Sequence, residues 1–184
     1  MKINDALEYI KGFIWNFKDY DNIERNLYGL NELIATKDCY KRKWFFNKLV
    51  VIVSISIIEA LLIDLIYRLK DGTNHFPAKL KVKQNIIKQN IRSKLCNKDN
   101  SLKNLSLSKT IDFLAENQIL ELLDFEPNLL NDLNRLRNRI HIKNYYKNHH
   151  PDENITFNEK TVKISFNSIK KLIREMGEKL QRPW

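Results

Sequence analysis

The sequence predicts an all-α fold, a bundle of about five to seven helices around one long buried helix. Only four glycines and four prolines occur in 184 residues, so residues that make sharp turns are scarce. Hydrophobic residues make up 43% of the chain, and most segments repeat them at helical spacing. The stretch from Leu49 to Ile66 is apolar almost throughout, which is typical of a helix buried on all sides.

The length predicts one domain, 1–184, with a core over about 41–180 and an N-terminal helical extension over 1–36. Within the extension, Ile3 to Phe17 carries one apolar stripe, and a second helix is expected over about 23–36.

The long helix is expected from Lys41 to Leu69, with a stop signal at Asp71 and Gly72. Its apolar stretch is also the one candidate for a membrane span. Glu59 and Asp64 interrupt that stretch. The uncharged part before Glu59 is only about half as long as a helix that spans a bilayer. We therefore favour the central helix of a soluble bundle, and a cytoplasmic protein.

Further helices follow the same spacing. A basic helix is predicted over Leu80 to Leu95, followed by a polar loop over Asn97 to Asn104. Ser106 is a suitable N-cap for a helix over Leu107 to Asn117. Pro127 fits the first turn of a helix whose apolar stripe is Leu129, Leu130, Leu133, Leu136 and Ile140.

The C-terminal part is less regular. Around residues 155–164 the pattern allows a short β-hairpin, and an amphipathic helix is predicted over Asn167 to Leu180. Its expected buried residues are Ile169, Leu172, Ile173 and Met176.

Charge is unevenly distributed. The chain carries a net charge of +10, and residues 79–109 contain nine Lys or Arg residues and a single acid, Asp99. Such a local excess attracts phosphate polyanions, although a merely solvated face is the alternative. The two cysteines, Cys39 and Cys96, are expected as buried reduced thiols, and no ligand spacing suggests a metal or a cofactor.

The segment from Asn134 to His141, NRLRNRIH, is the most informative part of the chain. The sequence uses 23 lysines and nine arginines, yet three of the nine, Arg135, Arg137 and Arg139, fall within five positions. Arginine is preferred where a planar, permanently charged fork must hold phosphate oxygens.

On an ideal helix, five polar-capable residues share one flank beside the buried stripe, within an arc of about 100°. They are Arg137, His141, Asn134, Tyr145 and Asn138. A cation and an imidazole together can cleave RNA: a base takes the 2′-OH proton, the oxygen attacks phosphorus, and the cation stabilises the phosphorane. The alternatives are that His141 caps the helix end and that Arg135 and Arg139 pair with Asp132 or face solvent.

The run LNRLRNRIHI resembles the motif of HEPN domains, an Arg and a polar residue followed after four to six positions by a His. VSISIIEALL, with Ser54, Ser56 and Glu59, resembles the second core helix of that family, and LSLSKTIDFLAENQIL resembles the helix before its motif helix. The resemblance covers about residues 41–145.

The resemblance implies a helical bundle that dimerises and acts as a metal-independent endoribonuclease. Such proteins serve as toxins or as phage-defence effectors, and many are paired with a nucleotidyltransferase-type antitoxin. It implies that His141 is the motif His and Asn138 the polar residue. Arg137 or Arg135 is then the motif Arg. Arg137 directly precedes Asn138, but only three residues separate it from His141. Arg135 is separated from His141 by the usual number of residues. We favour Arg137 because an ideal helix turns Arg135 about 120° away from His141.

Other residues are expected to support this site. Glu59 is expected to anchor Arg137 or a backbone group, or to orient His141 or Arg137. Tyr145 and Tyr146 are expected either to stack on a base or to pack at the helix end. Asn134, Arg139 and Lys143 complete the expected RNA contacts. The sequence thus predicts an endoribonuclease that leaves 2′,3′-cyclic phosphate ends. The alternatives are an inactive RNA- or partner-binding module and a plain helical scaffold.

Overall fold

The computed structural model describes residues 17–71, 78–138 and 153–179. Across these ranges the fold is an all-helical bundle, as the sequence predicts, and the only strand-like pairing is an isolated bridge between Cys96 and Leu102. In chain order the longer elements are α2 (Phe17–Ala35), α3 (Lys43–Asp71), α5 (Gln84–Asn90), α6 (Leu107–Glu116), α8 (Pro127–Asn138) and α10 (Glu159–Lys179). The short ones are the 3₁₀ turn η1 (Lys37–Cys39), α4 (Ala78–Lys81), the π-helical turn η2 (Ile91–Leu95), α7 (Ile119–Leu122) and α9 (Glu153–Thr156).

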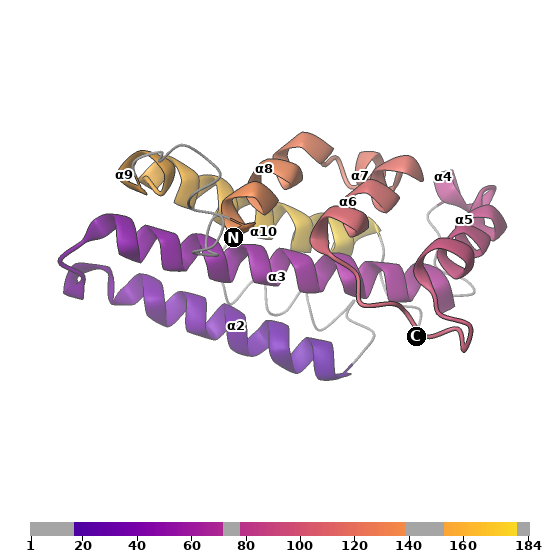
Figure 1. Ribbon diagram of the computed structural model, residues 1–184, viewed down its shortest axis with the longest axis horizontal. Coiled ribbons are helices and arrows are strands. Elements are labelled where there is room, and N and C mark those ends of the chain that lie inside the picture. The colour runs from indigo at the N-terminus through magenta and orange to yellow at the C-terminus, as the bar shows by residue number, and fades with distance from the viewer. Residues whose placement is uncertain (1–16, 72–77, 139–152, 180–184) are drawn as a thin grey trace.

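Helix α3 is the centre of the bundle (Figure 1). Helix α2 runs antiparallel beside it, α10 packs along another side, and α6 and α8 cover a third side. By length and hydropathy α3 is able to cross a membrane, but 61% of its most apolar stretch is buried by the other helices. This burial is what a core helix needs, since an apolar surface on all sides requires partners on all sides.

The described part of the predicted N-terminal extension belongs to the same core. Ile23, Leu27 and Leu30 of α2 are at most 1% exposed and pack in one cluster with the residues of α3. The helix predicted over Ile3 to Phe17 lies outside the described residues except for its last residue.

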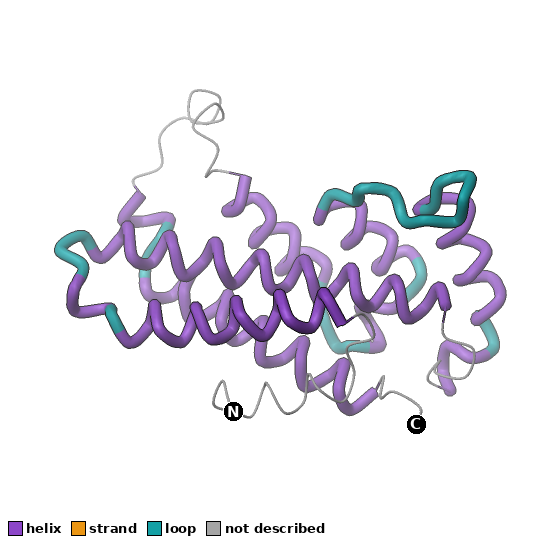
Figure 2. The backbone as a smooth tube through the Cα atoms, turned by 90° about the horizontal axis from the view of Figure 1, so that it is seen from below, coloured by secondary structure: helices purple, strands orange, loops and turns teal. Residues whose placement is uncertain are grey.

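The predicted basic helix over Leu80 to Leu95 is divided into α4, α5 and η2. A turn at Val82 and Lys83 separates the first two (Figure 2, teal), and the hydrogen bonding of the last five residues widens into a π turn. The residues expected to face the core do so: Leu80, Ile87, Ile91 and Leu95 are all at most 5% exposed. Of the two cysteines, Cys96 is buried as expected, but Cys39 is exposed, and neither forms a disulfide.

Helix α6 begins after Ser106, whose hydroxyl accepts a hydrogen bond from the Lys109 backbone N–H, as predicted for an N-cap. The single turn α7 was not predicted. It follows Gln118, a residue with φ of 60°, which breaks the chain direction after α6. Helix α8 begins at Pro127, the position that the sequence indicates.

The β-hairpin suggested around 155–164 is wrong, because this stretch contains the end of α9 and the first turns of α10. Asn158, between the two helices, accepts a hydrogen bond from the Thr161 backbone N–H at 3.0 Å and satisfies a donor that a helix start leaves unpaired. Phe157 is 1% exposed, and its carbonyl oxygen accepts a hydrogen bond from the Asn47 side chain at 2.8 Å. Helix α10 therefore begins eight residues before the Asn167 predicted as its start.

Candidate functional site

Helix α8 is fixed by its apolar face. Leu130 and Leu133 are buried, and Leu129 and Leu136 pack partly buried against the core. These contacts determine which of the polar residues on α8 approach α3 and which point to solvent.

Arg137 and Glu59 form a bidentate ion pair between α8 and α3. Nη1 of Arg137 donates to Oε1 of Glu59 at 3.0 Å, and Nη2 lies 2.9 Å from Oε2. The side chains are 35% and 18% exposed, so the pair lies at the edge of the core rather than inside it. Two parallel bonds fix both the distance and the plane of the guanidinium. The contact of Glu59 with Arg137 is therefore one of the alternatives that the sequence predicts for Glu59.

The pair leaves part of Arg137 available. A guanidinium has five N–H donors, and Glu59 occupies two of them. Among the described residues no other acceptor contacts this guanidinium. The remaining edge is able to bind a phosphate oxygen while Glu59 holds the opposite edge in place.

Arg135 lies on the other side of α8. It pairs with Asp132 at 3.2 Å, and both side chains are mostly exposed, at 79% and 68%. An exposed pair of this kind contributes little to stability. The two candidates for the motif arginine therefore differ in environment: Arg137 is oriented against the central helix, and Arg135 is turned to solvent.

The remaining predicted site residues are only partly covered. Asn134 is half-buried on α8, and Asn138, its last residue, is exposed. Arg139, His141, Lys143 and Tyr145 lie outside the described residues. Of the predicted site residues, the structure thus brings together Arg137 and Glu59.

Two serines on α3, Ser54 and Ser56, belong to the segment that resembles the second HEPN core helix. Ser56 is exposed, and its hydroxyl donates to the Ile52 carbonyl at 3.1 Å. The hydroxyl of Ser54 is fully buried and has no hydrogen-bond partner in the described part of the chain.

A second ion pair on α3 was missed. Asp64 and Arg68 are 0% and 8% exposed and lie 3.6 Å apart. Their spacing of four residues, an acid before a base, is the signal that could have identified the pair.

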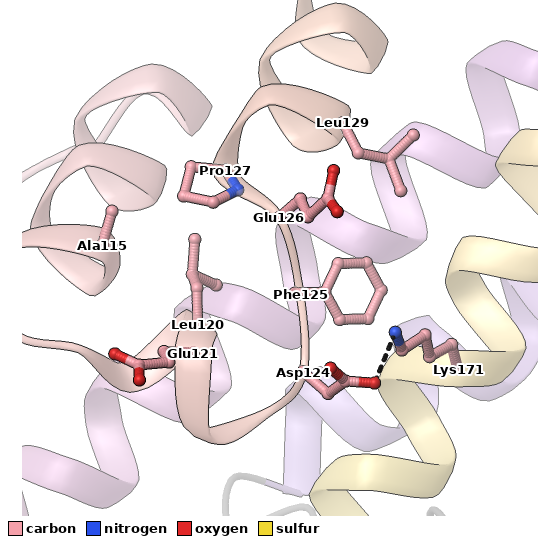
Figure 3. A pocket seen from close by; sticks show the side chains of 9 residues that line it. All are labelled: Ala115, Leu120, Glu121, Asp124, Phe125, Glu126, Pro127, Leu129 and Lys171. Carbon is pink, nitrogen blue, oxygen red and sulfur yellow. Dashed lines mark ion pairs between the residues drawn. The ribbon is translucent and has the colours of Figure 1, made fainter.

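A concavity of about 680 Å³ lies where the α7–α8 connection meets α10 (Figure 3). Its floor is apolar, with Leu120, Phe125 and Leu129, and its rim carries the carboxylates of Glu121, Asp124 and Glu126. The rim is more acidic than basic, so it is a poor site for the phosphates of RNA.

Lys171 joins this concavity to α10. Its ammonium lies 3.0 Å from an Asp124 carboxylate oxygen and 5.3 Å from the centre of the Phe125 ring. The hydrogen bond and the positive charge of Lys171 hold the pKa of Asp124 below its ordinary value.

Within residues 17–71, 78–138 and 153–179, no three His, Cys, Asp or Glu side chains are close enough together to hold a metal ion. A comparison with protein-family models, with curated proteins and with solved structures gives no match in any of the three.

Proposed function

We propose that the chain is a HEPN-like, metal-independent endoribonuclease that acts in the cytoplasm as a toxin or phage-defence effector. The observation that carries the proposal is the Arg137–Glu59 pair: a guanidinium held in one orientation, with three donors left, on the flank of α8. Such a pre-oriented cation is what stabilisation of a phosphorane requires. His141 follows Arg137 by four residues in the sequence, as a base for the same reaction.

In the proposed reaction, the His141 imidazole takes the proton of a ribose 2′-OH. The 2′ oxygen then attacks the adjacent phosphorus, and Arg137 stabilises the charge that gathers on the non-bridging oxygens. The bond from phosphorus to the 5′ oxygen breaks, and that oxygen receives a proton. The products are a 2′,3′-cyclic phosphate and a 5′-OH end. Two copies of the chain, each supplying one Arg and one His, would form the full site of a homodimer.

The partners follow from the same proposal. RNA is the substrate, and a nucleotidyltransferase-type antitoxin or another defence protein is the proposed regulator.

The test is cleavage of single-stranded RNA by the purified chain in EDTA. Arg137→Ala should lower the rate by about 10²- to 10³-fold, the usual cost of removing one transition-state donor. His141→Ala should abolish cleavage. Arg135→Ala is the matched control, because it removes an arginine from the same helix on its solvent side, and it should retain most of the activity. Equal loss in Arg135→Ala and Arg137→Ala would contradict the assignment.

A second function is favoured by one observation. Because Glu59 already neutralises Arg137, the pair could serve mainly to lock α8 onto α3, in a module that binds RNA or a protein partner without cleaving. The same assay separates the two functions, since a binding module retains RNA but yields no product, whatever residue stands at position 141.

A further inference from the structure

A polar groove is formed by exposed side chains of α5 and η2. Helix α5 lies at one end of the bundle, away from α8 (Figure 1). The concavity measures about 690 Å³, and its lining consists of Asn85, Lys88, Gln89, Arg92 and Ser93. These residues recur every three or four positions, so they share one face of the helix. None of them is acidic, and two are permanent or near-permanent cations.

Two basic residues close to this groove in the sequence have side-chain partners of their own. Lys94 is paired with Glu116 at 2.8 Å, and Lys83 donates to the Gln118 side chain at 2.5 Å. For Lys88 and Arg92, by contrast, the described part of the chain supplies neither an ion-pair partner nor a hydrogen-bond acceptor. The positive charge of the groove is therefore available to a ligand.

The π turn η2 contributes Arg92 and Ser93 to the lining of the groove. The turn keeps Ile91 and Leu95 buried while Arg92 and Ser93 stay exposed. π turns are rare in proteins and frequently occur at functional sites. The side chains that result are a point charge, a planar fork, two amides and a hydroxyl, the groups that proteins direct at phosphate and sugar oxygens.

We propose that this groove binds the sugar–phosphate backbone of single-stranded RNA as a contact separate from Arg137. The choice of RNA as the polyanion rests on the function proposed above. Lys88 and Arg92 would bind phosphate oxygens, while Asn85 and Gln89 would bond ribose hydroxyls or further phosphate oxygens. The groove would raise the affinity for RNA and leave the chemical step to the residues on α8.

An anionic membrane surface is the competing ligand, because Val82 and Ile86, which are close to the groove residues in the sequence, are 92% and 59% exposed. Membrane-bound helices present a whole apolar face opposite a charged one. Here the apolar face of α5 is buried in the bundle, and two aliphatic residues remain outside. A concave lining of amides and a hydroxyl therefore fits an RNA strand better than a bilayer.

The experiment measures binding of a labelled single-stranded RNA by fluorescence anisotropy, in the His141→Ala background so that the RNA stays intact. Lys88→Gln/Arg92→Gln should reduce the slope of log affinity against log salt by about 1.4, since each phosphate contact contributes about 0.7. Between about 50 and 200 mM salt, the affinity of the parent should then fall roughly sevenfold more than that of the double variant. Arg92→Lys keeps the charge and should keep the slope.

The matched control is Lys160→Gln/Lys163→Gln, which removes two exposed charges from the first turns of α10, at the other end of the bundle. It should leave the salt slope unchanged. Equal slopes for the groove variant and the parent, equal losses in the groove and control variants, or no RNA binding by the parent, would overturn the proposal. Loss of binding to phosphatidylserine vesicles with unchanged RNA binding would overturn it in favour of a membrane.

A cleavage assay keeps this proposal distinct from the nuclease proposal. With His141 intact, the groove variant should raise KM and leave kcat unchanged. If no condition yields cleavage, yet the groove variant lowers the salt slope, the nuclease proposal fails and the groove stands. If cleavage proceeds with an unchanged KM in the groove variant, the groove fails and the nuclease proposal stands.

Discussion

Glu59 and Arg137 are 78 positions apart in the chain, and their side chains meet in two parallel contacts of 3.0 and 2.9 Å. The contacts join the middle of α3 to the last turn of α8. They hold the arginine in place through a carboxylate on the central helix α3. Any role of Arg137 therefore depends on Glu59 as well.

The first prediction concerns the strength of this pair. In a double-mutant cycle of Glu59→Gln and Arg137→Gln, we expect a coupling free energy of about 1 kcal/mol, because partial exposure of the arginine screens the charges. The free energies of unfolding are measured by urea denaturation. The same cycle on Asp132 and Arg135 is the control, and it should give about 0–0.5 kcal/mol, as exposed pairs do. Equal coupling in the two pairs would show that Glu59 does not hold Arg137 specifically.

The second prediction concerns the geometry of Arg137. Arg137→Lys keeps the positive charge, but a lysine cannot bind Glu59 with a planar fork and a phosphate with the remaining edge. We expect RNA cleavage to fall by about tenfold or more while the fold is retained, as circular dichroism would show. Arg135→Lys should cleave like the parent. A fully active Arg137→Lys variant would mean that charge alone matters at this position.

The third prediction tests the arrangement of residues 155–164. In a β-strand, Ile155 and Phe157 would share one face, whereas here Ile155 is 71% exposed and Phe157 is 1% exposed. Phe157→Ala should lower the free energy of unfolding by about 3–5 kcal/mol, and Ile155→Ala by less than about 0.5 kcal/mol. Similar losses in both variants, measured by urea denaturation, would contradict the helical arrangement.

The fourth prediction concerns acid stability at the end of α10. Burial raises the pKa of Glu175, but hydrogen bonds and charges from Lys179 and Arg174 outweigh it, so the pKa lies below its ordinary value. A carboxyl with a lowered pKa in the folded state stabilises the fold above its unfolded pKa of about 4.5, and that contribution is lost as the pH falls through the folded value.

Lys179→Met removes one of these partners. The variant should be less stable than the parent at neutral pH, and the difference should shrink as the pH falls below about 4.5. Urea midpoints measured across this range give the result. Because Lys179 also donates to the Leu122 carbonyl at 2.8 Å, part of the difference should persist at low pH. A difference that grows on acidification would contradict this account.

Much of the fold was predictable because helical spacing is a local property. The apolar stripe of α10, Ile169, Leu172, Ile173 and Met176, is buried as predicted, and Pro127 begins α8. What failed was set by tertiary contacts. The residues around Phe157 alternate like a strand, yet its side chain enters the core from a turn that Asn47 and Asn158 stabilise.

The candidate site was only partly predictable for the same reason. Helical geometry separates Arg137 from Arg135, and the structure places them in different environments. That Glu59, rather than another acid, meets Arg137 depends on how α8 crosses α3, which no local pattern contains. Likewise, the charge of residues 79–109 is plain in the sequence, but which cations keep a free charge depends on whether an acid such as Glu116 lies near.

The length of α3 has a consequence for how the protein tolerates change. This one helix contacts α2, α5, α6, α8, α9 and α10. A substitution that displaces α3 at one end therefore alters its packing against helices at the other end. Unfolding should be cooperative, without an independent half that survives the other. Substitutions far from Glu59 along α3 should then weaken its contact with Arg137, and a loss-of-function screen would recover mutations along the whole length of α3.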